Sequence, residues 1–157
     1  MARKTFSEKL HAVKDLPRIQ YIGVDNKLAK RFGQGHMLIA APVEYDEVMK
    51  LVPEGRLIMA DKIREYLAKK HNADYTCPLT AGLFINLAAH AAEERRKAGD
   101  NNITPYWRTL KTGGELNEKY PGGIEQHKLL LEKEGHEIVC RGKRYFVKDF
   151  EKFLITL

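Results

Sequence analysis

The stretch from residue 105 to 136 constrains the fold of this chain more than any other. It opens with a proline, two large aromatic residues and an arginine, and continues through the loop sequences Gly113-Gly114 and Pro121-Gly122-Gly123. Paired glycines reach backbone conformations that other residues avoid, and proline fixes its own φ angle, so these positions predict tight turns. The last residues of the stretch have the pattern of a short helix. Such a stretch is typical of a binding site built on loops.

The composition is that of a globular protein with one domain. The chain has 157 residues, of which 43% are hydrophobic and 31% are charged. This length supports one hydrophobic core but not two substantial ones. The order of helical and strand-like patterns predicts a mixed α/β, helix-rich fold. No apolar run approaches the ~18 residues of a membrane span, and no apolar segment follows the basic N-terminus, so we expect a cytoplasmic protein without membrane contact.

The charge and the cysteines limit the classes of partner. The net charge of +6 and the isoelectric point near 9.3 favour a polyanion, because neutralising phosphates is the main source of non-specific nucleic-acid affinity. Cys77 and Cys140 lie far apart, and neither belongs to a Cys-x-x-Cys pair or a Cys/His cluster. We therefore expect two free thiols, no metal site and no cofactor.

Residues 1–44 are predicted to be a basic N-terminal extension. Within it, residues 7–14 fit a short helix, residues 26–31 fit a helical turn, and the apolar run at 36–41 fits a short buried strand. A basic cluster in the helical turn either contacts phosphates or forms a solvated helix face. This cluster consists of Lys27, Lys30 and Arg31.

Three helices are predicted after this extension. Residues 43–52 place Leu51 and other apolar side chains on one face, and residues 60–71 repeat apolar positions at helical spacing. The third helix begins near Thr76, which we expect to be its N-cap, and continues to about residue 97. Between residues 78 and 92 this helix is apolar on nearly all sides, which predicts that it is buried.

Residues 137–157 are predicted to form a β-hairpin followed by a helix. Two alternating apolar runs, 137–140 and 144–147, flank a turn that contains Gly142. Asp149 is expected to cap a last helix that continues to Leu157. The hairpin tip carries three basic residues, which either contact a polyanion or only keep the turn soluble. These residues are Arg141, Lys143 and Arg144.

Residues 105–136 also resemble the active-site segment of the O6-alkylguanine-DNA alkyltransferases. That segment has a Pro-Cys-His-Arg motif, a glycine turn, Tyr-x-Gly-Gly, a Lys-Leu-Leu helix and Glu-Gly-His. The positions that match in order are Pro105, Arg108, Gly114, Tyr120, Gly122, Gly123, Leu130, Glu134, Gly135 and His136.

The resemblance fails at the residues that carry the family's chemistry. Tyr106 stands in place of the nucleophilic cysteine, and Trp107 stands in place of the histidine base. A phenol does not replace a thiolate as alkyl acceptor, and an indole only donates a hydrogen bond, so alkyl transfer is not expected. The chain is more similar to the alkyltransferase-like proteins, which lack the cysteine. Leu79 stands where the family has an arginine that fills the gap left by a flipped guanine, although apolar wedges also unstack bases.

The resemblance implies a winged helix-turn-helix-like alkyltransferase DNA-binding domain at residues 45–136, with 1–44 and 137–157 as extensions. It implies that the chain binds double-stranded DNA, with O6-alkylguanine as the candidate lesion, and acts as a non-catalytic sensor in DNA repair. It places the lesion pocket at Tyr106, Trp107, Arg108, Tyr120, Gly122 and Glu134. It places the DNA-contacting helix and loop at Leu79, Thr80, Gly82, Lys111 and Lys119.

Alternatives stay open within this pocket. Tyr106 and Trp107 either offer a stacking face to a flipped base or simply fill the space. Arg108 either orders the loop or meets a phosphate. Glu134 has no cysteine–histidine pair to complete, so we expect its carboxylate to accept a hydrogen bond from the Trp107 indole.

Two other classes of function also stay open. A protein- or RNA-interaction module on the same scaffold, without a lesion pocket, is favoured by the weakly basic character of the helix that begins near Thr76. The sequence does not identify a protein partner. An enzyme that acts through Cys77 is the third hypothesis, but no catalytic dyad or triad is apparent around it.

Overall fold

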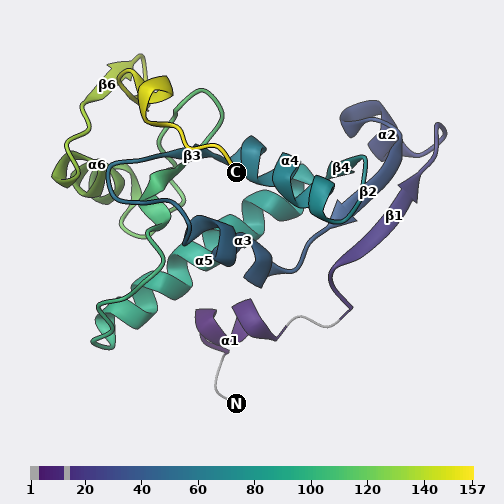
Figure 1. Cartoon of the computed structure of the whole chain (residues 1–157), viewed down its shortest axis with the longest axis horizontal. Helices are drawn as coiled ribbons and strands as arrows, with labels where there is room; N and C mark the ends of the chain where they lie inside the picture. The colour runs from purple at the N-terminus through teal and green to yellow at the C-terminus, as the bar shows by residue number, and fades with distance from the viewer. Residues whose placement is uncertain (1–3, 13–14) are drawn as a thin grey trace.

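The computed structural model describes residues 4–12 and 15–157, which form a helix-rich α/β fold around one long helix (Figure 1). This helix, α5 (Pro78–Lys97), packs against α1 (Phe6–His11), α3 (Pro42–Met49) and α4 (Ala60–Lys70). Small side chains on α5 let these helices approach closely. The buried alanines of α5 are Ala81, Ala88, Ala89, Ala91 and Ala92.

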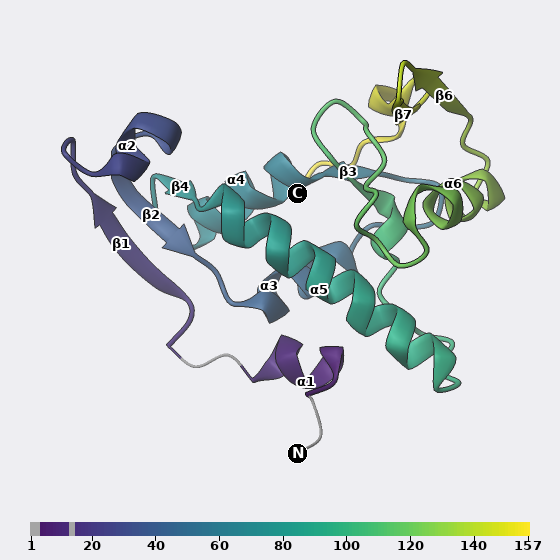
Figure 2. The same ribbon diagram turned by 180° about the vertical axis from the view of Figure 1, so that it is seen from behind.

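A three-stranded sheet lies at the start of α5 (Figure 2). Its order is β1 (Arg18–Ile22), β2 (Gly35–Ile39) and β4 (Tyr75–Thr76), and β2 runs antiparallel to β1 and parallel to β4. The helix α2 (Lys27–Phe32) connects β1 to β2. The strand predicted at 36–41 and the helical turn at 26–31 are therefore confirmed.

The N-terminal residues contain more regular structure than the sequence predicts. The strand β1 is not predicted, because four of its five residues are exposed and leave only a weak apolar alternation. Pairing with β2 stabilises it instead. The helix predicted at 7–14 ends at His11, and residues 13–14 lie outside the described residues.

The three central helices lie close to their predicted places, with three corrections. Leu51 is not on a buried helix face, because α3 ends at Met49 and Leu51 is 60% exposed. Cys77 is the N-cap of α5, whereas Thr76 ends β4 and its hydroxyl donates to the Arg64 carbonyl at 2.8 Å. The prediction that α5 is buried all round is also wrong, because Leu79 and Leu83 are exposed.

The second half of the chain forms its own apolar cluster. The two-residue strand β3 (Ile58–Met59) pairs in parallel with β5 (Thr109–Leu110), and α6 (Gly123–Lys133) follows. The predicted hairpin is confirmed as β6 (Ile138–Arg141) and β7 (Arg144–Val147). Residues from these segments bury one another. They are Leu57, Leu110, Leu116, Leu131 and Val147.

The predicted C-terminal helix is only a short 3-10 helix, η2 (Phe150–Phe153). Asp149 precedes it with a φ of 54°, and its side chain makes no capping hydrogen bond. The chain then runs extended beside Leu57, whose N–H donates to the Phe153 carbonyl and whose carbonyl accepts from Ile155, both at 2.9 Å. This backbone pairing replaces the hydrogen bonds of a longer helix.

Candidate functional site

The segment that carries the family resemblance folds as a 3-10 turn followed by a strand. In η1 (Tyr106–Arg108), the Arg108 N–H donates to the Pro105 carbonyl at 3.1 Å. The strand β5 then pairs with β3 and fixes the direction of the turn. Tyr106 consequently enters the core beside α5, whereas Trp107 and Arg108 reach the C-terminal end of α6.

Glu134, directly after α6, is the centre of a buried hydrogen-bond network. Its Oε2 accepts from the Trp107 indole Nε1 at 2.8 Å and from Nη2 of Arg108 at 2.8 Å. Its Oε1 accepts from the Gly55 N–H at 3.0 Å. Nη1 of Arg108 donates to the Val52 carbonyl at 2.8 Å. The predicted hydrogen bond between Trp107 and Glu134 is confirmed, and the network joins the loop at 53–55 to the turn at 106–108.

This network keeps Glu134 charged although it is buried. Burial raises the pKa of the carboxyl, but hydrogen bonds from Arg108, Gly55 and Trp107 outweigh burial, so the pKa lies below its usual value. The side chains of Arg108 and Glu134 are only 14% and 7% exposed. Of the two roles expected for Arg108, the structure supports ordering of the loop, since the guanidinium is already occupied.

Tyr106 and Tyr120 belong to the core. Tyr106 is 1% exposed, and its ring lies edge-on to Trp107 and to Tyr120 with centroid distances of 5.3 Å. The Tyr120 hydroxyl donates to the Thr109 carbonyl at 2.8 Å. Burial raises the pKa of both phenols. Tyr106 therefore fills the space at the position that resembles the alkyltransferase nucleophile, and the alternative that it presents a stacking face in an open pocket is wrong.

His127 is a site residue that the sequence did not reveal. It is fully buried in α6, where its Nδ1 accepts from the Asn117 N–H at 3.1 Å and its Nε2 donates to the Trp107 carbonyl at 2.8 Å. Burial lowers the pKa of His127 to about 4. The ring is thus a neutral link between two loops, and a lone histidine in a helical pattern carries no signal for that role.

An open hollow of about 590 Å³ lies between α5 and the loop that connects β5 to α6. Leu79 and Gly82 lie on its helix side, and Lys111 and Lys119 lie on its loop side. Its volume is within the ~300–1,000 Å³ of typical ligand pockets. The structure therefore brings together four of the five residues predicted for the DNA-contacting helix and loop, and Thr80 lies in the same first turn of α5.

Two hydrogen bonds hold this loop against α5. The Asn117 side-chain amide donates to the Asn86 side-chain oxygen at 2.9 Å. Nε2 of His90 donates to the Lys119 carbonyl at 3.0 Å. The hollow is consequently bounded by a helix and a loop that are tied together.

The rim of the hollow is apolar on the helix side and carries two lysines and the Glu118 carboxylate on the loop side. Leu79 and Leu83 are 48% and 66% exposed and lie one helical turn apart. The first-turn N–H groups of a helix have no intrahelical acceptor, so the Leu79 and Thr80 amides are available to an anion. Lys111 lies 3.3 Å from Glu118, whereas Lys119 makes no ion pair with any described residue.

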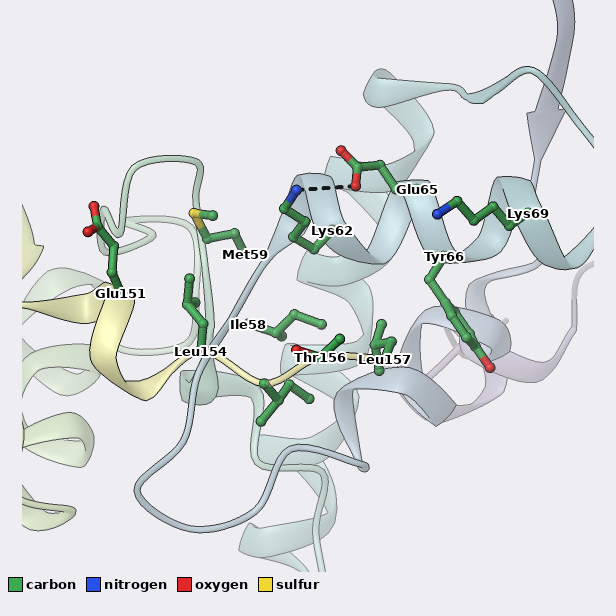
Figure 3. Close-up of a pocket in the computed structure, with 11 residues that line it drawn as sticks. Ile58, Met59, Lys62, Glu65, Tyr66, Lys69, Glu151, Leu154, Thr156 and Leu157 are labelled. Carbon is green, nitrogen blue, oxygen red and sulfur yellow. Dashed lines mark hydrogen bonds and ion pairs between the residues drawn. The ribbon is translucent and has the colours of Figure 1, made fainter.

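A second hollow, of about 530 Å³, lies between α4 and the C-terminal segment (Figure 3). Lys62 and Glu65 form an ion pair of 3.3 Å at its edge, and Leu154 and Leu157 border it. It includes none of the predicted site residues. In residues 4–12 and 15–157, no cluster of His, Cys, Asp or Glu is arranged to hold a metal, and no helix has the length and apolar content to cross a membrane.

Comparison with known proteins decides the fold. No model of a known protein family and no curated protein sequence matches the chain. Among solved structures, S. pombe Atl1 in complex with damaged DNA containing O6-carboxymethylguanine matches with a TM-score of 0.53 and 16% identity, over 74% of this chain and 94% of its own. S. pombe ATL in complex with DNA matches with a TM-score of 0.54 and 17% identity, over the same shares. The chain has the alkyltransferase-like fold.

Within the alkyltransferase-like fold, only Tyr120 of the predicted pocket residues lines the hollow together with the predicted contact residues. Trp107, Arg108 and Glu134 form the buried network, and none of the three lines the hollow. Gly122 lies apart from both groups, beside smaller surface hollows near Lys97. Its φ is 79°, and a Cβ there would lie 2.5 Å from the Gln126 Cβ, so the turn before α6 requires glycine for steric reasons.

Proposed function

We propose that this chain binds double-stranded DNA at the first turns of α5 and responds to O6-alkylguanine without accepting the alkyl group. The observation that carries the proposal is the hollow between Leu79 and Gly82 on the helix side and Lys111 and Lys119 on the loop side. Exposed leucines at its edge suit insertion between bases, and the lysines suit the flanking phosphates. The net charge of +6 supports the same class of partner.

The fold supports the proposal as well. Both matching structures, S. pombe Atl1 and S. pombe ATL, are complexes with DNA, and one of these DNAs contains O6-carboxymethylguanine. In this chain, the exposed Leu79 lies on the helix side of the hollow, in the first turn of α5, where a duplex can approach. A duplex placed there also reaches Lys119 on the loop.

The absence of alkyl transfer rests on the residues at the former catalytic positions. The Tyr106 phenol is buried and its pKa is raised, first by burial and then by the nearby Glu93 carboxylate, so it is neither accessible nor ionised. Both nitrogens of His127 are hydrogen-bonded, and the Glu93 carboxylate accepts hydrogen bonds from Arg96, so neither group is a free base for the phenol. Cys77 is 6% exposed at the start of α5. The proposed role is therefore recognition.

A salt titration of duplex binding tests this proposal. The logarithm of the binding constant should fall linearly with the logarithm of the salt concentration, with a slope of about −0.9 for each phosphate contacted. Lys119→Ala should reduce this slope by about one phosphate's worth, while Lys128→Ala on α6, outside the proposed surface, should leave it unchanged. A duplex with one O6-alkylguanine should bind more tightly than the plain duplex. Absence of duplex binding at low salt would overturn the proposal.

A protein- or RNA-interaction module is the second candidate, and the exposed Leu79 and Leu83 favour it. Exposed apolar side chains on one helix face are typical of protein-docking surfaces. In that case Leu79→Ala and Leu83→Ala would abolish binding to the partner, and the salt titration with duplex DNA would show no binding.

A further inference from the structure

The N-terminal β1–α2–β2 unit, residues 18–39, forms a basic arm at one end of the molecule (Figures 1 and 2). It carries four cationic side chains and one carboxylate, Asp25. The arm pairs with the rest of the fold through β4, which leads directly into α5. It therefore lies beside the start of the helix that borders the proposed DNA site.

The cationic side chains of α2 point to the solvent because the apolar side chains of the same helix pack against the core. Leu28 and Ala29 pack against a cluster that includes Ile22, Met37 and Cys77. The three cationic positions, at i, i+3 and i+4, are exposed. The Asn26 side chain accepts from the Leu28 N–H at 2.9 Å and fixes the start of the helix. The outward cations are Lys27, Lys30 and Arg31.

Several contacts tie this arm to the N-terminal end of α5. The Cys77 N–H donates to the Leu38 carbonyl at 2.8 Å, and Cys77 is the N-cap of α5. The Tyr75 hydroxyl donates to the carbonyl of Gly33, the residue after α2, at 2.7 Å. Phe84 of α5 packs against the same apolar cluster as Leu28. The helix α2 is thus held in a fixed position relative to the start of α5.

These cations are free to bind a ligand. Within the described residues, Lys27, Lys30 and Arg31 form no ion pair with a carboxylate. The carboxylate of Asp74, in the loop before β4, instead accepts from the His36 N–H at 2.7 Å and lies 3.4 Å from the His36 ring. The Arg31 guanidinium lies over the Phe32 ring at 5.0 Å, which orients it without neutralising it.

We propose that the basic arm is a second contact with the DNA backbone, in which Lys27 and Lys30 bind phosphates on the duplex beyond the site at α5. This inference rests on the proposed function, because the same duplex occupies both surfaces. Charge complementarity assigns the occupant, since an exposed row of cations beside a helix start with unpaired N–H groups fits a continuous phosphate backbone. The arm would increase the affinity and lengthen the segment of duplex that the protein covers, without contributing sequence specificity.

The test compares two double variants that each remove two lysines. Lys27→Ala/Lys30→Ala removes the proposed contact, and Lys128→Ala/Lys133→Ala removes two lysines from α6, at the other end of the molecule from α2 (Figure 1). Both sets are surface substitutions, so unfolding is not expected. The arm variant should lose about 1.8 from its salt slope, which makes its loss of affinity between about 50 and 200 mM salt ~12-fold smaller than that of wild type. The α6 variant should match wild type.

The outcomes separate this inference from the proposed function. If wild type does not bind duplex DNA, the proposed function fails and the inference with it. If wild type binds and the arm variant shows the same slope, the inference alone is wrong. Equal losses in both double variants would also overturn it, because net charge would then explain the effect. A short duplex that reaches only α5 should bind wild type and the arm variant equally.

Discussion

Glu134→Gln should strongly destabilise the fold, because it removes the charge that compensates Arg108. The Arg108 side chain is 14% exposed, and its guanidinium depends on two carboxylate oxygens and one backbone carbonyl. Breaking a buried ion pair by removing one partner typically costs ~3–5 kcal/mol. For a chain of this size, each kcal/mol lowers the melting temperature by ~2–4 °C, so we expect a decrease on the order of 10 °C.

Thermal and urea unfolding measure this effect, and the chain offers a matched control. Glu132→Gln changes an exposed glutamate near the end of the same helix and should alter stability by less than ~0.5 kcal/mol. Combining Glu134→Gln with Arg108→Met should cost less than the sum of the single changes, because the two side chains interact directly.

The pH dependence has a defined sign. The folded-state pKa of Glu134 lies below its unfolded value, so its contribution is present above ~4.3 and is lost as pH falls through the folded pKa. Wild type and Glu134→Gln should therefore converge in stability in acid. A loss below ~1 kcal/mol for Glu134→Gln at neutral pH, or simple additivity in the double variant, would refute this account of the network.

Three further predictions follow from the site. The pKa of His127 is depressed to about 4, so its contribution to stability is present above pH ~6.5 and falls by up to ~3 kcal/mol as the pH falls towards 4. In urea unfolding, the stability of His127→Gln should therefore depend less on pH between about 6.5 and 4 than that of wild type. An unchanged pH dependence would contradict the assignment of a neutral ring. Gly114→Ala places a Cβ 2.5 Å from the Phe150 ring, whereas the Cβ of Gly113→Ala meets nothing within 4 Å. Both glycines have φ above 80°, so each substitution should lower the free energy of unfolding by ~1–2 kcal/mol through backbone strain. Thermal melting should show a clearly larger loss of stability only for Gly114→Ala, because of the added clash. Intact-mass measurement after incubation with O6-methylguanine duplex should show no gain of about 14 Da, because no thiol is present at the Tyr106 position. A stoichiometric gain on Cys77 or Cys140 would contradict the proposed absence of alkyl transfer.

Parts of the fold were predictable where local pattern and tertiary environment agree. The hairpin at β6–β7 and the helices α4 and α5 follow from alternation, helical spacing and glycine turns. The strand β1 and the extended C-terminal segment were not predictable in this way, because backbone partners distant in sequence stabilise them. The exposure of Leu79 and Leu83 depends on how α5 is oriented, which an almost uniformly apolar helix does not encode.

In the candidate site too, the features that depend on local chemistry were predictable and those that depend on tertiary packing were not. The Trp107–Glu134 hydrogen bond was predictable, since the indole N–H only donates and an ionised carboxylate only accepts hydrogen bonds. The burial of Tyr106 and the link through His127 were not, because both depend on which side of η1 faces α5. Trp107, Arg108 and Glu134 therefore form a structural network, whereas Leu79, Gly82, Lys111 and Lys119 line an open surface.

Backbone amide NMR of the 18.0 kDa protein during titration with a duplex would locate the DNA-binding surface residue by residue. We expect chemical-shift changes to concentrate at Leu79, Thr80, Gly82 and Lys119, with weaker changes in α2 and none in the hairpin turn at Gly142. The changes should increase on a duplex that contains O6-alkylguanine. Changes confined to β6 and β7, or no changes at any residue, would contradict the claim that DNA binds at the start of α5.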